Sequence, residues 1–136
     1  MKRLVCALLV LIALFGELAV VNNVHAFTPV SGILTSDVTW TKDNSPYNFT
    51  GNVVVAPNVT LTIEAGVLVN FGNSNLNVNG ALIARGSSSD KIVFQINSTP
   101  AFYTRQLSFQ SSSSGWNEQT GQGCIIENAI LKSVTI

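Results

Sequence analysis

The stretch VVVAPNVTLTIEAGVLVNFGNSNLNVNGALIARG, residues 53–86, shows most clearly which secondary structure this chain forms. Short apolar runs, rich in Val, Leu and Ile, are separated by Gly, Asn and Pro. Several runs alternate apolar and polar residues, as Leu61-Thr62-Ile63 and Leu76-Asn77-Val78 do. Nowhere after residue 27 do apolar residues keep helical spacing over three turns. This combination predicts short β-strands joined by tight turns.

These strands recur in the same order along the chain. Apolar triplets repeat at offsets of 23, 21 and 23 residues: 53–55 with 76–78, 61–63 with 82–84, and 69–71 with 92–94. A period in this range is typical of stacked coils. One coil cannot bury its apolar side chains alone, so neighbouring coils stack and their strands pair in parallel. The repeat therefore predicts an all-β stack of coils.

Asparagine occupies every second position from residue 73 to residue 79, with Ser74, Leu76 and Val78 between. Alternate side chains of a strand point to opposite faces. We therefore expect the apolar side chains to point inward, and the asparagines to point outward or to form stacked ladders at the corners. A row of sugar-binding asparagines is the alternative interpretation.

Several segments together carry a family resemblance: Thr39–Lys42 with Ser45–Tyr47, Thr60–Val67, Leu82–Gly86 with Lys91–Phe94, and Gly115–Gly121 followed by Gly123–Ala129. They resemble the N-terminal region of right-handed parallel β-helix repeat proteins of archaeal and bacterial cell surfaces, with Ala65 where that family usually has Pro. The resemblance implies an all-β, right-handed parallel β-helix of about three to four coils with an N-terminal cap. A short β-sandwich is the alternative fold.

The same resemblance divides residues 27–136 into two parts. Residues 27–50 are expected to form the cap, with Trp40 and Tyr47 covering the first coil. Residues 51–136 are expected to form the coils, open or truncated at the C-terminus, because the last strand-like run carries no polar cap. An uncovered end of such a stack exposes apolar interior and unpaired strand edges.

The first 26 residues have the pattern of a secretory signal peptide. Met1-Lys2-Arg3 is a positive n-region, and an uncharged apolar run extends from Leu4 to Phe15. Val24-His25-Ala26 then places small residues at positions −3 and −1 of a cleavage site. We expect cleavage after Ala26 and a secreted or cell-surface protein. An uncleaved membrane anchor is the alternative, although Glu17 keeps the apolar run shorter than the ~20 residues that span a bilayer.

Charge and composition exclude several classes of partner. The chain carries seven basic and seven acidic residues, and removing the signal segment leaves five basic side chains with no basic run. Nucleic acid binding is therefore not expected. The hydrophobic fraction of 46% also argues against a disordered chain. Membrane contact is expected only through the signal segment before its cleavage.

The candidate modification sites are three sequons, at Asn48, Asn58 and Asn97, each followed two residues later by Thr. Cys124 is the only cysteine after residue 26, so no internal disulfide is expected there. We interpret it as a small buried apolar residue beside Ile125 and Ile126. Pairing between chains and a free thiol are the alternatives.

Candidate chemistry is sparse, and no catalytic residue, cofactor or metal ligand is predicted. The acidic residues after position 26 are scattered: Asp37, Asp43, Glu64, Asp90, Glu118 and Glu127. Glycoside hydrolysis needs two carboxyl groups roughly 5–10 Å apart around one bond. Glu64 and Arg85 occupy corresponding repeat positions, so we expect them to pair across adjacent coils as an exposed salt bridge. Asp90-Lys91 is expected to stay solvated.

Two functions are compatible with these observations. The first is an exported, non-catalytic β-helix module that serves as a cell-surface scaffold or adhesion element and contacts glycans. The second is the N-terminal fragment of a carbohydrate-active β-helix enzyme, a polysaccharide lyase or hydrolase. The expected partners are surface glycans, or another protein that pairs with the strand edge at the C-terminus.

Overall fold

The computed structural model describes residues 26–96 and 105–136; the predicted signal peptide and Asn97 lie outside these ranges. The described chain is all-β, with one short 3-10 helix, η1 (Lys42–Asn44), and no α-helix. The strands are β1 (Thr28–Leu34), β2 (Val38–Trp40), β3 (Tyr47–Val55), β4 (Thr60–Ile63), β5 (Leu68–Asn70), β6 (Leu76–Val78), β7 (Ala81–Arg85), β8 (Ile92–Gln95), β9 (Arg105–Phe109), β10 (Ile125–Glu127), β11 (Ala129–Lys132) and β12 (Val134–Thr135).

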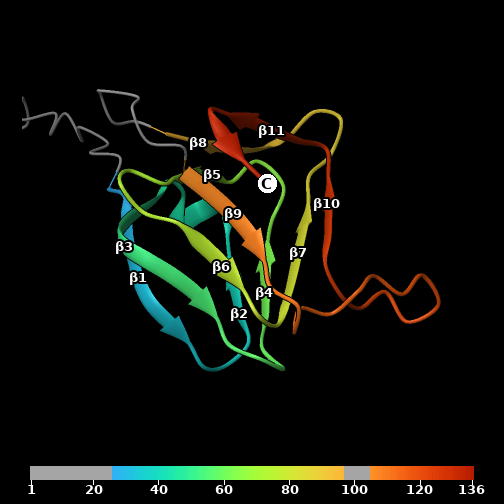
Figure 1. The fold of residues 1–136 in the computed structure, drawn as a ribbon. Coiled ribbons are helices and arrows are strands. Elements are labelled where there is room, and N and C mark those ends of the chain that lie inside the picture. The colour runs from blue at the N-terminus through green and yellow to red at the C-terminus, as the bar shows by residue number, and fades with distance from the viewer. Residues whose placement is uncertain (1–25, 97–104) are drawn as a thin grey trace, which may run out of the picture.

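The strands form three parallel ladders (Figure 1). The first ladder contains the beginnings of β1 and β3, then β5, β8 and β11. The second contains the ends of β1 and β3, then β6, β9 and β12. The third contains β2, β4, β7 and β10. The chain passes through the three ladders in turn, and we call each passage a rung.

The direction of strand pairing separates the two predicted folds, a stack of parallel coils and a short β-sandwich. Every pairing between the named strands is parallel. A β-sandwich consists of antiparallel strands, so the sandwich alternative is wrong. The molecule is a curled, parallel-stranded all-β structure, and it resembles a solenoid in the way its rungs stack (Figure 1).

Two of the three predicted repeat offsets are confirmed by the strand register. Val53 pairs with Leu76, and Leu61 pairs with Leu82. The third offset is wrong by two residues, because Val69 pairs with Phe94. The turn before β8 is longer than the corresponding turn before β5, which moves the register. Side-chain direction repeats every two residues, so the same apolar side chains still point inward.

The interior of the stack is filled with aliphatic and aromatic side chains. Leu76 and Val78 are fully buried, which confirms that the apolar residues of the asparagine row point inward. Phe71 is also fully buried, with its ring centroid 4.8 Å from that of Phe49 and 6.3 Å from that of Phe94. This aromatic column connects three successive rungs, because the three rings come from the first ladder and the turns that adjoin it.

The asparagines form ladders between rungs. Asn75 receives a backbone hydrogen bond from Gln106 (3.0 Å) and donates its own amide hydrogen to Asn52 Oδ1 (2.9 Å). Asn77 Oδ1 accepts a hydrogen bond from the Ser108 hydroxyl (2.7 Å). Each bond links a side chain to a neighbouring rung, so Asn75 and Asn77 contribute to the stacking of the rungs, as the ladder interpretation expects.

The predicted cap segment lies at one end of the stack and also supplies strands to the ladders. β1 and β2 pair in parallel with β3 and β4. Trp40 and Tyr47 are buried and stack at 4.8 Å. The predicted boundary at residue 50 falls inside β3, because this strand continues past Gly51 from the first ladder into the second.

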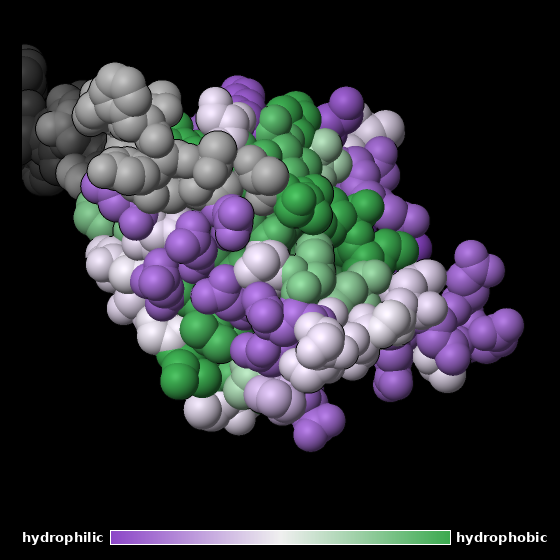
Figure 2. All heavy atoms as spheres, viewed as in Figure 1, coloured by the Kyte–Doolittle hydropathy of each residue, from purple (hydrophilic) through white to green (hydrophobic). Residues whose placement is uncertain are grey.

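The other end of the stack is more open. The inward residues of the last rungs are only half-buried against the core: Phe109, Cys124, Ile126, Ala129, Leu131 and Val134. Figure 2 shows hydrophobic side chains gathered on the face that carries β10 and β11. Since β10 and β11 end their sheets, their outer edges have no strand neighbour among the described residues.

Candidate functional site

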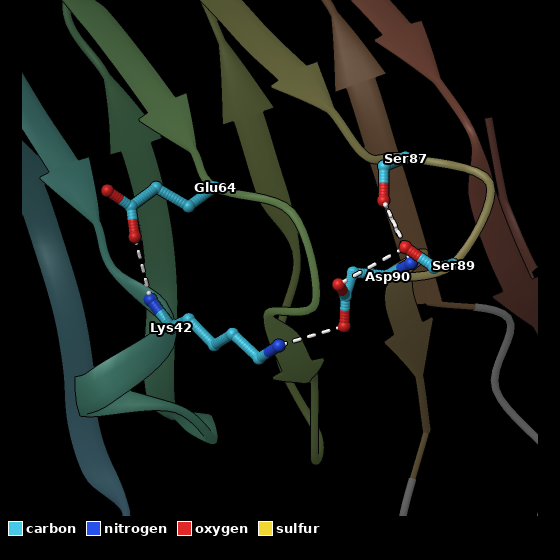
Figure 3. Close-up of polar contacts among 5 residues, drawn as sticks. All are labelled: Lys42, Glu64, Ser87, Ser89 and Asp90. Atoms are coloured by element: carbon cyan, nitrogen blue, oxygen red, sulfur yellow. Dashed lines mark hydrogen bonds and ion pairs between the residues drawn. The ribbon is translucent and has the colours of Figure 1, made fainter.

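The charged side chains at the turns form contacts between rungs (Figure 3). Lys42 Nζ donates to Asp90 Oδ1 at 2.8 Å, and the backbone amide of Lys42 donates to Glu64 Oε2 at 2.9 Å. The Asp90 side chain is 47% exposed and so stays solvated, as predicted, but it also has an ion-pair partner that the sequence did not indicate. The long turn before β8 brings it beside a lysine that lies 48 residues earlier in the chain.

The titration of this cluster does not suit acid–base chemistry. The hydrogen bond between Lys42 and Asp90, helped by the attraction between their charges, lowers the pKa of the Asp90 carboxyl from its ordinary value of 3.8. The same contacts raise the pKa of the Lys42 ammonium from 10.5. A general acid or base works best with a pKa near the operating pH. Both pKa values move further from neutral pH, so both groups are charged at neutral pH.

Arg85 does not pair with Glu64 as predicted. Its Nε donates to Glu127 Oε2 at 2.7 Å, and its guanidinium carbon lies 5.3 Å from the centre of the Trp116 ring. Arg85 and Glu127 are register partners on β7 and β10. Glu64 is held instead by the backbone of Lys42. The repeat period could not reveal this pairing, because Glu127 follows Arg85 after 42 residues instead of about 21.

A groove of about 520 Å³ lies beside the third ladder. Its residues come from the turn before β4, from β4 and β7, and from the segment between β9 and β10: Asn58, Val59, Thr60, Ala81, Ile83, Ser114, Gly115, Asn117, Thr120, Gln122 and Gly123. The segment 114–123, which we call the flap loop, forms part of the long excursion after β9 in Figure 1. The groove is therefore built by residues that are distant in sequence.

The flap loop is held by its own hydrogen bonds and by the stack. Asn117 pairs through its backbone with Gln122 in an antiparallel bridge, and its side-chain oxygen accepts hydrogen bonds from the amides of Gln119 and Thr120. Ser114 donates its amide hydrogen to the carbonyl oxygen of Gly80 (2.9 Å). These bonds tie the beginning of the loop to the stack at Gly80, the residue before β7.

The run Gly115–Gly121, which resembles the beginning of the next coils, lies between β9 and β10 and leads into the last strands, β10, β11 and β12. The groove itself was not predicted. Alternating Gly, Asn and Gln signal a turn, but they do not tell which ladder the turn will cover.

Two of the three sequon asparagines lie in the described residues, in contrasting environments. Asn58 is exposed, in a turn, with φ of 63°. Asn48 is half-buried on β3, between β1 and β5, and its Oδ1 accepts a hydrogen bond from Asn70 Nδ2 at 2.6 Å. Gln95 continues this ladder by donating to Asn70 Oδ1 at 2.9 Å.

We expect folded protein recovered from a host that performs N-glycosylation to carry a glycan on Asn58 and none on Asn48. A glycan on Asn48 would displace Asn70 from the ladder, whereas Asn58 is exposed. Peptide mapping by mass spectrometry, with Asn58→Gln as the control that removes one sequon, checks this. Recovery of folded protein with a high occupancy at Asn48 would contradict the expectation.

Cys124 is half-buried, with its thiol 3.7 Å from the carbonyl oxygen of Gly80. It packs against the core together with Ile126. Across residues 26–96 and 105–136, no three His, Cys, Asp or Glu side chains gather as metal ligands would. Within the same ranges no helix is long and apolar enough to cross a membrane.

Comparison with known proteins identifies no relative. No family model, no curated protein and no solved structure matches the chain.

Proposed function

We propose that this protein is an exported, non-catalytic, right-handed parallel β-helix that serves as a scaffold or adhesion element at the cell surface and contacts glycans there. The curled parallel ladders support the fold. The signal-like segment supports export and a secreted or cell-surface location.

The observation that carries this proposal is that the carboxylates form contacts between neighbouring rungs. Four acidic side chains join one rung to another: Asp37 to the amide of Thr60, Glu64 to the amide of Lys42, Asp90 to Lys42 Nζ, and Glu127 to Arg85. Carboxylates in these contacts help to hold the stack in register. Carboxylates of a hydrolase would instead flank a space for the scissile bond.

The strand edges of β10 and β11 support the other partner expected from the sequence, a protein that pairs with a strand edge near the C-terminus. Edge strands present unpaired backbone groups that pair readily with another strand. The half-buried side chains of Ile126 and Leu131 lie beside these edges and would gain burial from such a partner.

An adhesion assay and an activity assay test the proposal together. Microspheres coated with the purified protein are expected to adhere to polysaccharide-bearing cell surfaces more than albumin-coated microspheres. Incubation with neutral and acidic polysaccharides is expected to release no reducing ends and no unsaturated products. Release that is abolished by Glu64→Gln or Asp90→Asn would contradict the proposal and favour the carbohydrate-active alternative.

A further inference from the structure

The groove beneath the flap loop is lined by neutral polar groups. Amide side chains come from Asn58, Asn117 and Gln122, and hydroxyl groups come from Thr60 and Thr120. Amides and hydroxyls both donate and accept hydrogen bonds. Among the described residues, no charged side chain belongs to the lining. Such a lining matches a ligand whose own groups both donate and accept and carry no charge.

The same groove also has an aliphatic part. Val59, Ala81 and Ile83 contribute to its lining from β7 and from the turn before β4. Binding sites for small molecules usually combine apolar walls with a few polar groups and have volumes of ~300–1,000 Å³. A sugar ring has hydroxyl groups around its rim and C–H groups on its faces, so it presents both kinds of surface that this groove offers.

The two sides of the groove are preorganised. The parallel ladder holds β4 against β7, and the flap loop is tied to the stack by the hydrogen bond from Ser114 to Gly80. Gly123 packs so closely against Gly115 that a side chain at this position would overlap the backbone. A preformed site loses less conformational entropy on binding than a flexible one.

From these observations we propose that the groove between the β4–β7 face and the flap loop binds an uncharged saccharide of one to three sugar units. This inference rests on the proposed surface function and names the site that contacts glycan. Charged saccharides are disfavoured, because no charged side chain of the described residues belongs to the lining, and Arg85, which contacts Trp116 of the flap loop, is paired with Glu127. The saccharide has two sources: a free glycan of a surface, or the glycan attached to Asn58 of the same chain.

Nuclear magnetic resonance titration tests the site. The full chain, labelled with ¹⁵N and produced in a host without N-glycosylation, is titrated with maltose, cellobiose, lactose and chitobiose, and with digalacturonic acid as the charged comparison. We expect at least one neutral disaccharide to shift the amide signals of Thr60, Gly115 and Gln122. Gln122→Ala is expected to weaken this binding about fivefold, the effect of one lost hydrogen bond. Gln119→Ala, on the same loop but outside the lining, is the matched control.

The remaining outcomes separate the two sources and overturn the proposal where it is wrong. If no free disaccharide binds, but the glycan on Asn58 of protein from a glycosylating host contacts Ile83 and Gln122 in nuclear Overhauser spectra, the chain's own glycan is the ligand. If neither binds, or if digalacturonic acid binds more tightly than the neutral sugars, the inference is wrong. If microspheres coated with the Gln122→Ala protein still adhere while no saccharide binds in the groove, the inference about the groove is wrong and the proposed surface function stands.

Discussion

Replacing Phe71 with alanine is expected to lower the free energy of unfolding by about 3–5 kcal/mol, the usual cost of truncating a buried aromatic side chain. Phe71 is fully buried at the centre of the aromatic column, between Phe49 and Phe94. Its removal leaves a cavity that adjoins three rungs. Interfaces between neighbouring rungs contribute much of the stability of a stacked structure, so the loss extends beyond one strand.

Urea denaturation followed by circular dichroism measures this change. Phe27→Ala is the matched control, because the side chain of Phe27 is 54% exposed. We expect the control to change the unfolding free energy by less than about 0.5 kcal/mol, as surface substitutions usually do. A Phe71→Ala protein as stable as the control would show that the aromatic column does not support the stack.

Replacing Gly80 with alanine is expected to destabilise the protein by about 3 kcal/mol, at the upper end of the usual cost of overpacking. A Cβ atom at this position would overlap the backbone carbonyl oxygens of Val59 and Ala56. These atoms belong to the preceding rung and cannot rotate away as a flexible side chain would. Relief of the overlap requires the rungs to separate, which would weaken the β4–β7 pairing.

Gly115→Ala is the control for this substitution, because a Cβ atom at Gly115 would meet no atom within 4 Å. Thermal unfolding of the two variants side by side measures the difference. The Gly80 variant is expected to melt at a clearly lower temperature, and the Gly115 variant close to the unsubstituted protein. Equal melting temperatures would mean that the two rungs lie further apart at Gly80 than in the structure.

The part of the fold predicted from sequence is the part with a regular period. Val53 and Leu61 were aligned correctly with Leu76 and Leu82, because short turns of similar length separate those strands. The first half of β3 lies outside the predicted repeat, which begins at Val53. Asn44-Ser45-Pro46 signals a break in the chain, but the new strand begins directly after it, at Tyr47. A breaker shows where a strand cannot continue, but it does not show how soon the next one starts.

The candidate site was much less accessible to prediction. Residues 114–123 are recognisable as turn-forming, but their contact with Gly80 depends on where the fourth rung lies. The partners of Arg85 and Lys42 are separated from them by 42 and 48 residues. These contacts are decided by the lengths of the turns between rungs, which vary from one rung to the next.

The order of residues alone was enough to predict short strands that repeat as stacked units, and to predict which side chains face inward. These properties follow from the alternation of apolar and polar residues and from the burial it requires. Only the folded stack shows which carboxylate meets which cation, and that the flap loop lines one groove together with β4 and β7. Such contacts depend on the register of whole rungs, because side chains distant in sequence meet only after the stack has placed them side by side.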